Sequence, residues 1–229
     1  MVSDAPVSLI PAAGVAARAA NLELRWMDDD LVVELARLAV RGVHDPSRMP
    51  FSTPWTRGTP DEIMRGMLEY QWATRTAIGP SRFRLEYAVL VDGVVVGSQG
   101  AGAKDWSVLR TVNTGSWLGQ EFQNRGIGTR MRMLMLDLLF AGLGANEVTS
   151  SAFSDNPASI AVSRKVGYRP DGTEVVAREG APATLQRFRM SHERWQDVRA
   201  SHRPHLGGPV TLEGVTALCE YLDTVSQAR

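Results

Sequence analysis

A glutamine and two glycines, Gln123, Gly126 and Gly128, come directly before a strongly helical pattern, and this arrangement can hold a phosphate. The first turn of a helix presents unpaired N–H groups and a partial positive charge, and glycine lets the backbone approach an anion closely. Three arginines crowd the same turn and can add charge-assisted contacts: Arg125, Arg130 and Arg132. The segment therefore indicates a pyrophosphate-binding turn, with a plain strand-to-helix turn as the alternative for this segment by itself.

A second polar pattern begins thirty residues after Gly126, where Asn156 and Pro157 open another helix. An asparagine cap followed by proline at the first helical position is a typical helix start. Ser159 lies in the first turn, and the helix is expected to end at Gly167. The start of this helix therefore carries polar side chains that could serve a reaction as well as a cap.

Hydrophobic periodicity predicts the elements that must position these two motifs. Alternation predicts strands over 22–26, 85–91, 110–118, 147–153, 172–178 and 184–191, with a return strand beginning at 94. Helical spacing predicts helices over 28–42, 60–77, 129–142, 156–167, 192–203 and 211–222. Asp92-Gly93 is a strong hairpin signal, and the run from Thr59 to Glu62 is typical of a capping box. The middle of the chain is therefore expected to be an antiparallel meander that leads into the glycine turn.

Two other glycine patterns and a histidine pair do not indicate a site. The run from Gly97 to Lys104 lacks the Lys-Ser/Thr pair that must follow the second glycine of a P-loop. A dinucleotide fingerprint would need a third glycine where Met131 stands. His202 and His205 have no cysteine nearby, so no metal site is expected.

The two motifs and this order of elements together resemble the GCN5-related N-acetyltransferase (GNAT) superfamily over about residues 22–191. The run from Asn156 to Tyr168 and the strand end Trp117-Leu118-Gly119 are similar to the branch that includes the ribosomal-protein N-terminal acetyltransferases. The resemblance implies an α/β (α+β) fold with a mixed, mostly antiparallel splayed sheet flanked by helices and a short helical C-terminal extension. The expected units are an N-terminal arm over 1–21, an N-acetyltransferase domain over 22–195 and the extension over 196–229.

The resemblance also implies acetyl-CoA as the co-substrate, with no metal. The strand that ends at Leu118 would part from the strand over 147–153, and the pantetheine arm would lie in the gap. A backbone N–H near Leu118 would then polarise the thioester carbonyl. The residues that the resemblance assigns to the cofactor are Trp117, Leu118, Gly119, Gln123, Arg125, Gly126, Ile127, Gly128, Thr129 and Asn156.

Acetyl transfer to an amine needs one group that deprotonates the ammonium and one that protonates the leaving thiolate. Many GNAT members place a tyrosine seven residues after the asparagine, where this chain has Ser163. Some place a glutamate five residues before it, where this chain has Ser151. In the branch that this chain resembles, the serine at the position of Ser159 has been considered for the role of acid, so the resemblance makes Ser159 the first candidate, ahead of Ser163, with capping or pocket lining as the alternative. Glu121, beside the glycine turn, is the nearest candidate for a base, directly or through water.

The missing glutamate restricts the kind of amine that can react. A lysine ε-amine has a pKa near 10.4, so its deprotonation at neutral pH costs about 4 kcal/mol. An α-amine has a pKa of about 7.7–8.0, and its deprotonation costs about 1 kcal/mol or less. A site without a strong general base therefore favours α-amines or other amines of low pKa.

The acceptor pocket is expected between the proline-broken loop 43–58 and the loop that joins the last two strands. Met49, Phe51 and Trp55 are the candidate acceptor-binding residues, and anchoring of the loop onto the body is the alternative. The expected function is acetyl-CoA-dependent transfer of an acetyl group to a primary amine of a small molecule or of a peptide or protein N-terminus. The alternatives are a non-catalytic acyl-CoA-binding or regulatory module, transfer of another acyl group or to oxygen, and an interaction protein without CoA.

Composition excludes several other classes of function. The 25 basic and 25 acidic residues give a formal net charge of zero, whereas proteins that bind nucleic acid usually carry a basic excess. No apolar run reaches the roughly 18 residues that a membrane-spanning helix needs. Cys219 is the single cysteine, which excludes an intrachain disulfide and is typical of a reducing, cytoplasmic location. Homodimers are the commonest assemblies, and a homodimer is the default expectation on that ground alone.

Overall fold

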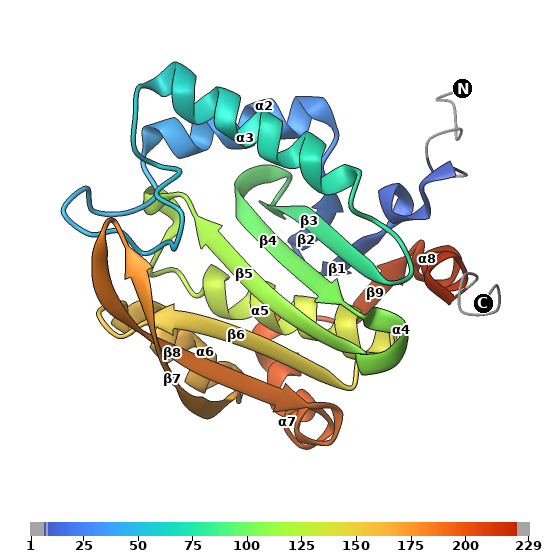
Figure 1. The fold of residues 1–229 in the computed structure, drawn as a ribbon. Coiled ribbons are helices and arrows are strands. Elements are labelled where there is room, and N and C mark those ends of the chain that lie inside the picture. Colours follow the sequence, from blue (N-terminus) through green and yellow to red (C-terminus); the bar gives the residue numbers. More distant parts are fainter. Residues whose placement is uncertain (1–6, 8, 224–229) are drawn as a thin grey trace.

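The computed structural model describes residue 7 and residues 9–223, which form one nine-stranded sheet with helices on both faces (Figure 1). The strand order is β7-β8-β6-β5-β4-β3-β2-β1-β9. The strands are β1 (Ala16–Ala19), β2 (Leu22–Trp26), β3 (Arg82–Val91), β4 (Val94–Lys104), β5 (Thr111–Leu118), β6 (Glu147–Phe153), β7 (Arg169–Arg178), β8 (Ala181–Ser191) and β9 (Val210–Glu213). Within this sheet β5 and β6 pair in parallel and the other neighbours with recorded register pair antiparallel. The expected mixed, mostly antiparallel fold is therefore confirmed.

Helices α2, α3, α6 and α7 begin at residues whose side chains cap the first turn. They are α2 (Asp29–Arg41), α3 (Pro60–Arg75), α4 (Trp106–Leu109), α5 (Ile127–Asp137), α6 (Pro157–Val166), α7 (His192–Leu206) and α8 (Val215–Asp223), with short turns η1 (Pro11–Gly14), η2 (Gln120–Phe122) and η3 (Leu138–Gly142). The Asp28 side chain accepts a hydrogen bond from the N–H of Leu31 at 2.9 Å. Thr59 and Glu62 form both bonds of a capping box. The predicted starts of these two helices are confirmed, because each start is set by residues adjacent in the chain.

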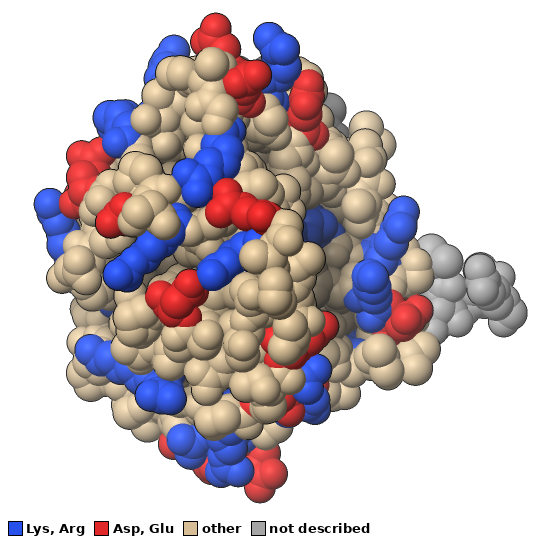
Figure 2. All heavy atoms as spheres, turned by 60° about the vertical axis from the view of Figure 1, so that its left-hand side comes forward, with Lys and Arg blue, Asp and Glu red and all other residues tan. Residues whose placement is uncertain are grey.

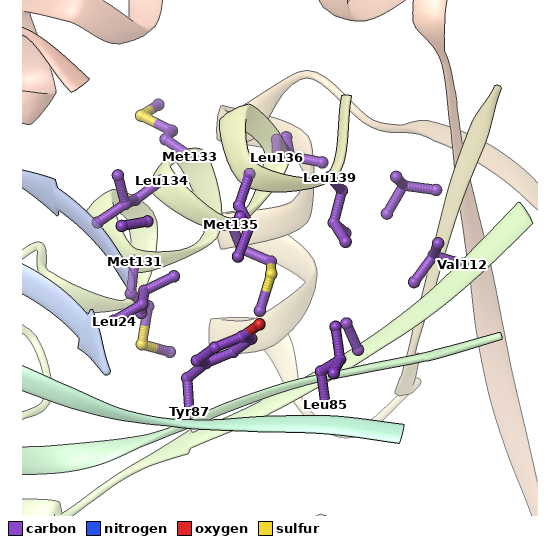
Figure 3. Packing of buried hydrophobic residues seen from close by; sticks show 14 of the residues in the cluster. Leu24, Leu85, Tyr87, Val112, Met131, Met133, Leu134, Met135, Leu136 and Leu139 are labelled. Carbon is purple, nitrogen blue, oxygen red and sulfur yellow. The ribbon is translucent and has the colours of Figure 1, made fainter. Parts of the chain in front are cut away.

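The two faces of the sheet carry separate apolar cores. Helices α2 and α3 cover one face and pack on Ala88, Leu90 and Val95. Helix α5 crosses the other face, where Leu24, Leu85 and Tyr87 meet its methionine and leucine side chains (Figure 3). Residues 131–140 are buried on every side. The central helix therefore lies inside the molecule, and its start is held rigidly at one edge of the sheet.

A short strand near each end of the described chain belongs to the sheet, whereas the sequence predicts an N-terminal arm over 1–21 and a helical extension over 196–229. Strand β1 pairs with β2 and with β9, so Ala16 lies opposite both Arg25 and Glu213. Residues 1–6, 8 and 224–229 lie outside the described residues. The expected helix over 211–222 begins only at Val215, and the expected boundary at 195 falls inside α7. Strands of four residues carry too little pattern to be recognised without their distant partners.

The hydroxyl of Tyr87 gives a test of the core on the α5 side. This oxygen is buried without a hydrogen-bond partner among the described residues. Because an unsatisfied buried hydroxyl destabilises the folded state, we expect Tyr87→Phe to raise the free energy of unfolding by about 1 kcal/mol, measured by urea denaturation. Tyr70→Phe is the matched control, since Tyr70 donates to Glu86 Oε1 at 2.7 Å and its loss should destabilise. A loss of stability in Tyr87→Phe as large as in the control would contradict this account.

None of the helices in the described part of the chain is both long and apolar enough to cross a bilayer.

Candidate active site

The two central strands part from each other halfway along their length. Thr111 to Thr114 of β5 pair in parallel with Glu147 to Ser150 of β6, and the pairing stops there. Strand β5 continues to pair with β4 as far as Leu118, and β6 continues to pair with β8 as far as Phe153. Residues 115–118 and 151–153 therefore form the two sides of a wedge that opens toward the ends of the strands (Figure 1). The expected splay of the sheet is confirmed.

A backbone amide of β5 faces into this wedge. The N–H of Gly119 donates to the carbonyl of Val96 on the β4 side at 3.0 Å. Since successive residues of a strand turn their amides to opposite edges, the N–H and carbonyl of Leu118 face the β6 side. The Leu118 carbonyl accepts from Nε2 of Gln123 at 3.0 Å, which leaves its N–H as the donor turned toward the wedge. The same Nε2 donates to the carbonyl of Val43 at 2.6 Å, so Gln123 joins the end of β5 to the loop after α2.

The glycine turn lies at the open end of the wedge. Asn124 and Gly126 have φ values of +58° and +77°, and Gly126 is the N-cap of α5 without any side-chain cap. Left-handed residues in such a turn direct successive N–H groups into one concave surface that suits an anion. A Cβ added at Gly126 would meet no heavy atom within 4 Å, whereas Gly128 faces Leu118 and Val162 at ordinary contact distance. The turn therefore presents open space above free backbone donors, and this fits a pyrophosphate.

The expected cluster of three arginines at the turn is wrong for two of them. Arg125 is exposed beside the turn, with its guanidinium 5.9 Å from the centre of the Phe122 ring. Arg130 donates to Asn21 Oδ1 at 2.7 Å, away toward the β1–β2 turn. Arg132 points inward and donates to Ser163 Oγ at 2.7 Å and to Ser150 Oγ at 2.8 Å. Because α5 is buried on all sides, its second turn directs side chains into the protein and not toward the cofactor turn.

The start of α6 places the predicted polar residues in two different environments. Asn156 Oδ1 accepts from the N–H of Ser159 at 3.1 Å, so its side chain is the cap of the helix. Ser159 is partly exposed. Ser163 is fully buried, and its hydroxyl donates to the Ser159 carbonyl at 3.0 Å. Of the two hydroxyl groups, that of Ser159 is therefore the more accessible.

The carboxylates that border the site are paired with arginines. Glu121, the candidate base on η2, accepts from Nε of Arg41 at 3.0 Å and its side chain is about half exposed. Asp155 accepts a two-fold contact from Arg178 at 2.9 and 2.7 Å. The Arg178 hydrogen bond holds the pKa of Asp155 below its usual range. A carboxylate whose pKa is lowered in this way is a weak proton acceptor, so Asp155 is poorly suited to act as a general base.

An aromatic row joins the loop 43–58 to the wedge. Phe51 and Trp55 lie 5.1 Å apart between ring centres, and Trp55 and Trp117 lie 5.4 Å apart. Trp117 packs on the α2 and α3 side, so its ring faces the acceptor loop while its backbone belongs to the strand beside the wedge. Met49 is buried, and its carbonyl accepts from Arg178 at 3.1 Å. The structure therefore brings the three predicted acceptor residues to one side of the predicted cofactor strand.

The loop 43–58 also meets the turn between β7 and β8. Arg57 donates to Glu179 of that turn at 2.9 Å, and Arg178 joins both segments to the start of α6. Figure 2 shows that acidic and basic side chains alternate over this side of the molecule, and neither sign forms a continuous patch. The sequence places Arg178 in the loop from Arg178 to Pro182 that is expected to line the acceptor pocket, but nothing near it in the chain indicates that Met49, more than a hundred residues earlier, is its partner.

In the described part of the chain, no three His, Cys, Asp or Glu side chains gather in a way that could hold a metal ion.

Comparison with known proteins identifies relatives of this arrangement. Residues 21–169 match the family model described as an acetyltransferase (GNAT) domain. Among solved structures, Mycobacterium smegmatis RimJ in complex with CoA-disulfide is 19% identical, with a TM-score of 0.68 over 83% of this chain and 95% of that one. RimL, a ribosomal L7/L12 alpha-N-protein acetyltransferase in complex with coenzyme A, is 17% identical, with a TM-score of 0.62 over 76% of this chain and 95% of that one. A GCN5-related N-acetyltransferase from Brucella melitensis is 18% identical, with a TM-score of 0.67 over 83% of this chain and 85% of that one. At these identities the structures show a shared fold.

Proposed function

The chain belongs to the GNAT acetyltransferase family, and from that premise we propose that it transfers an acetyl group from acetyl-CoA to the α-amine of a peptide or protein N-terminus or of a small molecule. The observation that carries this proposal is the wedge between β5 and β6, with the open glycine turn at its mouth and the Leu118 N–H directed into it. These features supply an anion-binding turn, a slot beside an unpaired strand edge and a carbonyl-polarising donor in one continuous region.

Different residues of the wedge would bind CoA and polarise the thioester carbonyl. The amides from Asn124 to Thr129, with Arg125, would hold the pyrophosphate, and the unpaired edge of Ser116 to Leu118 would hold the pantetheine arm. Acetyl-CoA supplies the activated acetyl group as a thioester. The Leu118 N–H would donate to the carbonyl oxygen as negative charge develops there, and a single donor of this kind is worth about 10²–10³ in kcat.

The ion pairs around the site favour an amine of low pKa. Glu121, Asp155 and Glu179 each contact an arginine, and hydrogen bonds from Arg178 and Arg57 lower the pKa values of Asp155 and Glu179. An α-amine needs about 1 kcal/mol or less for deprotonation at neutral pH, whereas a lysine side chain needs about 4 kcal/mol. RimL is described as an alpha-N-protein acetyltransferase, and the same class of acceptor would suit this site.

The acceptor would enter beside the aromatic row. One apolar wall is formed by Phe51, Trp55 and Trp117. Met49 belongs to the same loop as Phe51 and Trp55 and is buried. Such a wall suits the first side chain of a peptide or the body of a partly apolar amine. The hydroxyl of Ser159 is the accessible group at the start of α6 for returning a proton to the thiolate.

Two measurements on the purified protein test this function. CoA is expected to raise the melting temperature, and acetyl-CoA is expected to release free thiol faster with N-terminal peptides than with peptides whose α-amine is blocked and whose lysine is free. Stabilisation by CoA without thiol release above the enzyme-free rate, over a broad panel of amines, would instead indicate a binding module. Equal rates for both kinds of peptide would reject the preference for α-amines.

Arg178 holds both Asp155 and the carbonyl of Met49, and this clamp gives a prediction on acceptor binding. Lysine at this position cannot make the two-fold contact with Asp155 and also hold the Met49 carbonyl. We expect Arg178→Lys to raise the acceptor KM about threefold to tenfold, in line with about 1 kcal/mol for lost hydrogen bonds, with CoA affinity unchanged. Because the pKa of Asp155 is lowered, the pair of Asp155 and Arg178 contributes its full stabilisation at pH values above the usual carboxyl pKa. This stabilisation is lost only as the pH falls through the lowered pKa.

Arg110→Lys is the matched control for this substitution. Arg110 likewise pairs with an aspartate, Asp223, and lies over an aromatic ring, that of Trp106, but it lies beside the opposite end of β5. Steady-state kinetics of the control should match those of the wild type. An unchanged acceptor KM in Arg178→Lys would show that the clamp does not shape the acceptor pocket.

A further inference from the structure

A cavity lies between α5, α7 and β9, on the face of the sheet opposite α2 and α3 (Figure 1). Its volume is about 500 Å³, which is within the range of small-molecule sites in proteins. The lining consists of one acidic side chain, two basic side chains and the chain that leads into β9: Asp137, Arg199, Arg203, Gly208, Pro209 and Val210. All of these except Asp137 lie beyond residues 21–169, which match the acetyltransferase domain. The cavity is therefore formed jointly by that domain and the segment that follows it.

The carboxylate of this cavity is buried without a close donor. Asp137 is 7% exposed, and Nη2 of Arg199 lies 3.9 Å from its Oδ1, which is beyond the length of a hydrogen bond. Burial raises the pKa of Asp137, and the charges of Arg199 and Arg203 oppose this rise only in part. Asp137 is also the last residue before the π-helical turn η3, and such turns are frequent at functional sites. Because buried carboxylates are normally hydrogen-bonded, this one lacks a donor that a ligand could supply.

The two guanidinium groups of the cavity lie at its rim. Arg199 lies over the ring of Trp195, with its Cζ 4.3 Å from the ring centre. Arg203 follows one helical turn later, and its guanidinium forms no hydrogen bond or close ion pair with the described residues. Both arginines are exposed whereas Asp137 is buried, so positive charge surrounds the entrance and negative charge lies at the floor. The cavity therefore holds three charges that the protein itself pairs only loosely.

Other ionisable side chains on the surrounding elements are directed elsewhere. Arg130 of α5 donates to Asn21 Oδ1 at 2.7 Å, and Glu213 of β9 pairs with Arg18. His202 of α7 contacts a backbone carbonyl of α6 through Nε2 at 2.9 Å. The charges that line the cavity are therefore one carboxylate and two guanidinium groups.

We propose that this cavity binds a free α-amino dicarboxylic acid of the size of glutamate or aspartate. Such a ligand carries one ammonium group for the buried carboxylate and two carboxylates for the two guanidinium groups, and charge-assisted hydrogen bonds of this kind are the strong ones. The ammonium would donate to Asp137 at the floor, and the carboxylates would stay at the rim with Arg199 and Arg203. A dicarboxylate without an ammonium would leave Asp137 without a donor and add negative charge beside it. An amino acid with a single carboxylate would leave one guanidinium without a partner.

Isothermal titration calorimetry on the full chain tests the site with L-glutamate, L-aspartate and glutarate as probes. We expect at least one of the two amino acids to bind as a single molecule per chain and to raise the melting temperature. Glutarate has both carboxylates and no ammonium, so it should bind at least about tenfold more weakly. The site is about 15 Å along α5 from the glycine turn, and the measurement needs no CoA. Absence of binding by either amino acid at millimolar concentration would overturn the proposal, and so would equal affinity for glutarate.

Two substitutions examine the floor and the rim of the cavity separately. Asp137→Asn and Arg203→Gln are each expected to weaken binding of the amino acid at least about tenfold. Asp197→Asn is the matched control, because Asp197 is exposed on α7 and does not line the cavity, and its affinity should equal that of the wild type. Should Asp137→Asn fail to fold, the exposed Arg203 keeps the test open, since unchanged affinity in Arg203→Gln would refute the site.

The melting temperature without ligand separates a binding role of Asp137 from a purely structural ion pair. Because burial raises the pKa of Asp137, its charged form is disfavoured in the folded state. Asp137→Asn removes this charge and should therefore keep or raise the melting temperature while it weakens binding. A lower melting temperature together with undiminished amino-acid affinity would show that the carboxylate serves the fold through Arg199, and would refute the proposal.

Discussion

Gly126→Glu is expected to abolish binding of CoA while the far-ultraviolet circular dichroism stays that of the wild type. Gly126 has a φ of +77°, and the space beyond its missing Cβ is open. In the proposed function, a glutamate there would put a carboxylate where the phosphates would lie, against the same N–H groups that would bind them. The left-handed backbone adds about 1–2 kcal/mol of strain for a residue with a Cβ. Isothermal titration calorimetry should therefore show at least a hundredfold loss of affinity.

Gly144→Glu is the matched control for the glycine turn. Gly144 also has a positive φ, of +70°, and a Cβ there would also meet nothing within 4 Å. It lies beyond the other end of the α5–η3 helix, so the same strain and the same charge are introduced far from the turn. The control should bind CoA like the wild type. Unchanged CoA affinity in Gly126→Glu would remove the basis for placing the pyrophosphate at this turn.

Leu118→Pro is expected to lower kcat by about 10²–10³, the usual effect of removing one donor to a developing oxyanion. Proline deletes the N–H that faces the wedge, and this edge of β5 has no strand partner beyond Thr114, so no bond of the sheet is lost. Trp117 is in extended backbone, which the residue before a proline prefers. Thiol release under saturating acetyl-CoA and acceptor measures the change.

Leu118→Ala separates the amide from the side chain. Both substitutions remove most of a side chain that is 8% exposed and packs in the core on the α5 side. The alanine variant keeps the N–H, so its kcat should stay within a few-fold of the wild type at a temperature where both variants are folded. If the two variants lose activity equally, the packing of Leu118 matters and its amide is not the polarising group.

Local signals were sufficient for most of the elements that carry the site. The cap of α6 by Asn156, the capping box of α3 and the Asp92-Gly93 hairpin are formed as expected, and both hairpin residues have positive φ. Each of these features depends on residues within four positions of one another. The backbone groups that they satisfy are the same in any tertiary context.

The contacts of the site residues could not be predicted from the sequence in the same way. Gln123 was expected among the cofactor-binding residues, but the structure shows its amide on the carbonyls of Leu118 and Val43. Glu121 was expected near the chemistry, and it pairs with Arg41. Leu118 lies five residues before Gln123, but Val43 and Arg41 each lie 80 residues before their partners, and no spacing rule relates positions so far apart.

The helix starts, the antiparallel meander and a glycine turn that can accept an anion are all readable in the sequence, because they follow from periodicity and from backbone groups that neighbouring residues satisfy. Contacts between distant segments set the rest: β1 and β9 join the sheet, the aromatic loop meets Trp117, and Arg132 turns inward. The direction of a charged side chain depends on what surrounds its helix. The zero net charge therefore says nothing about Arg132, which α5 directs into the interior.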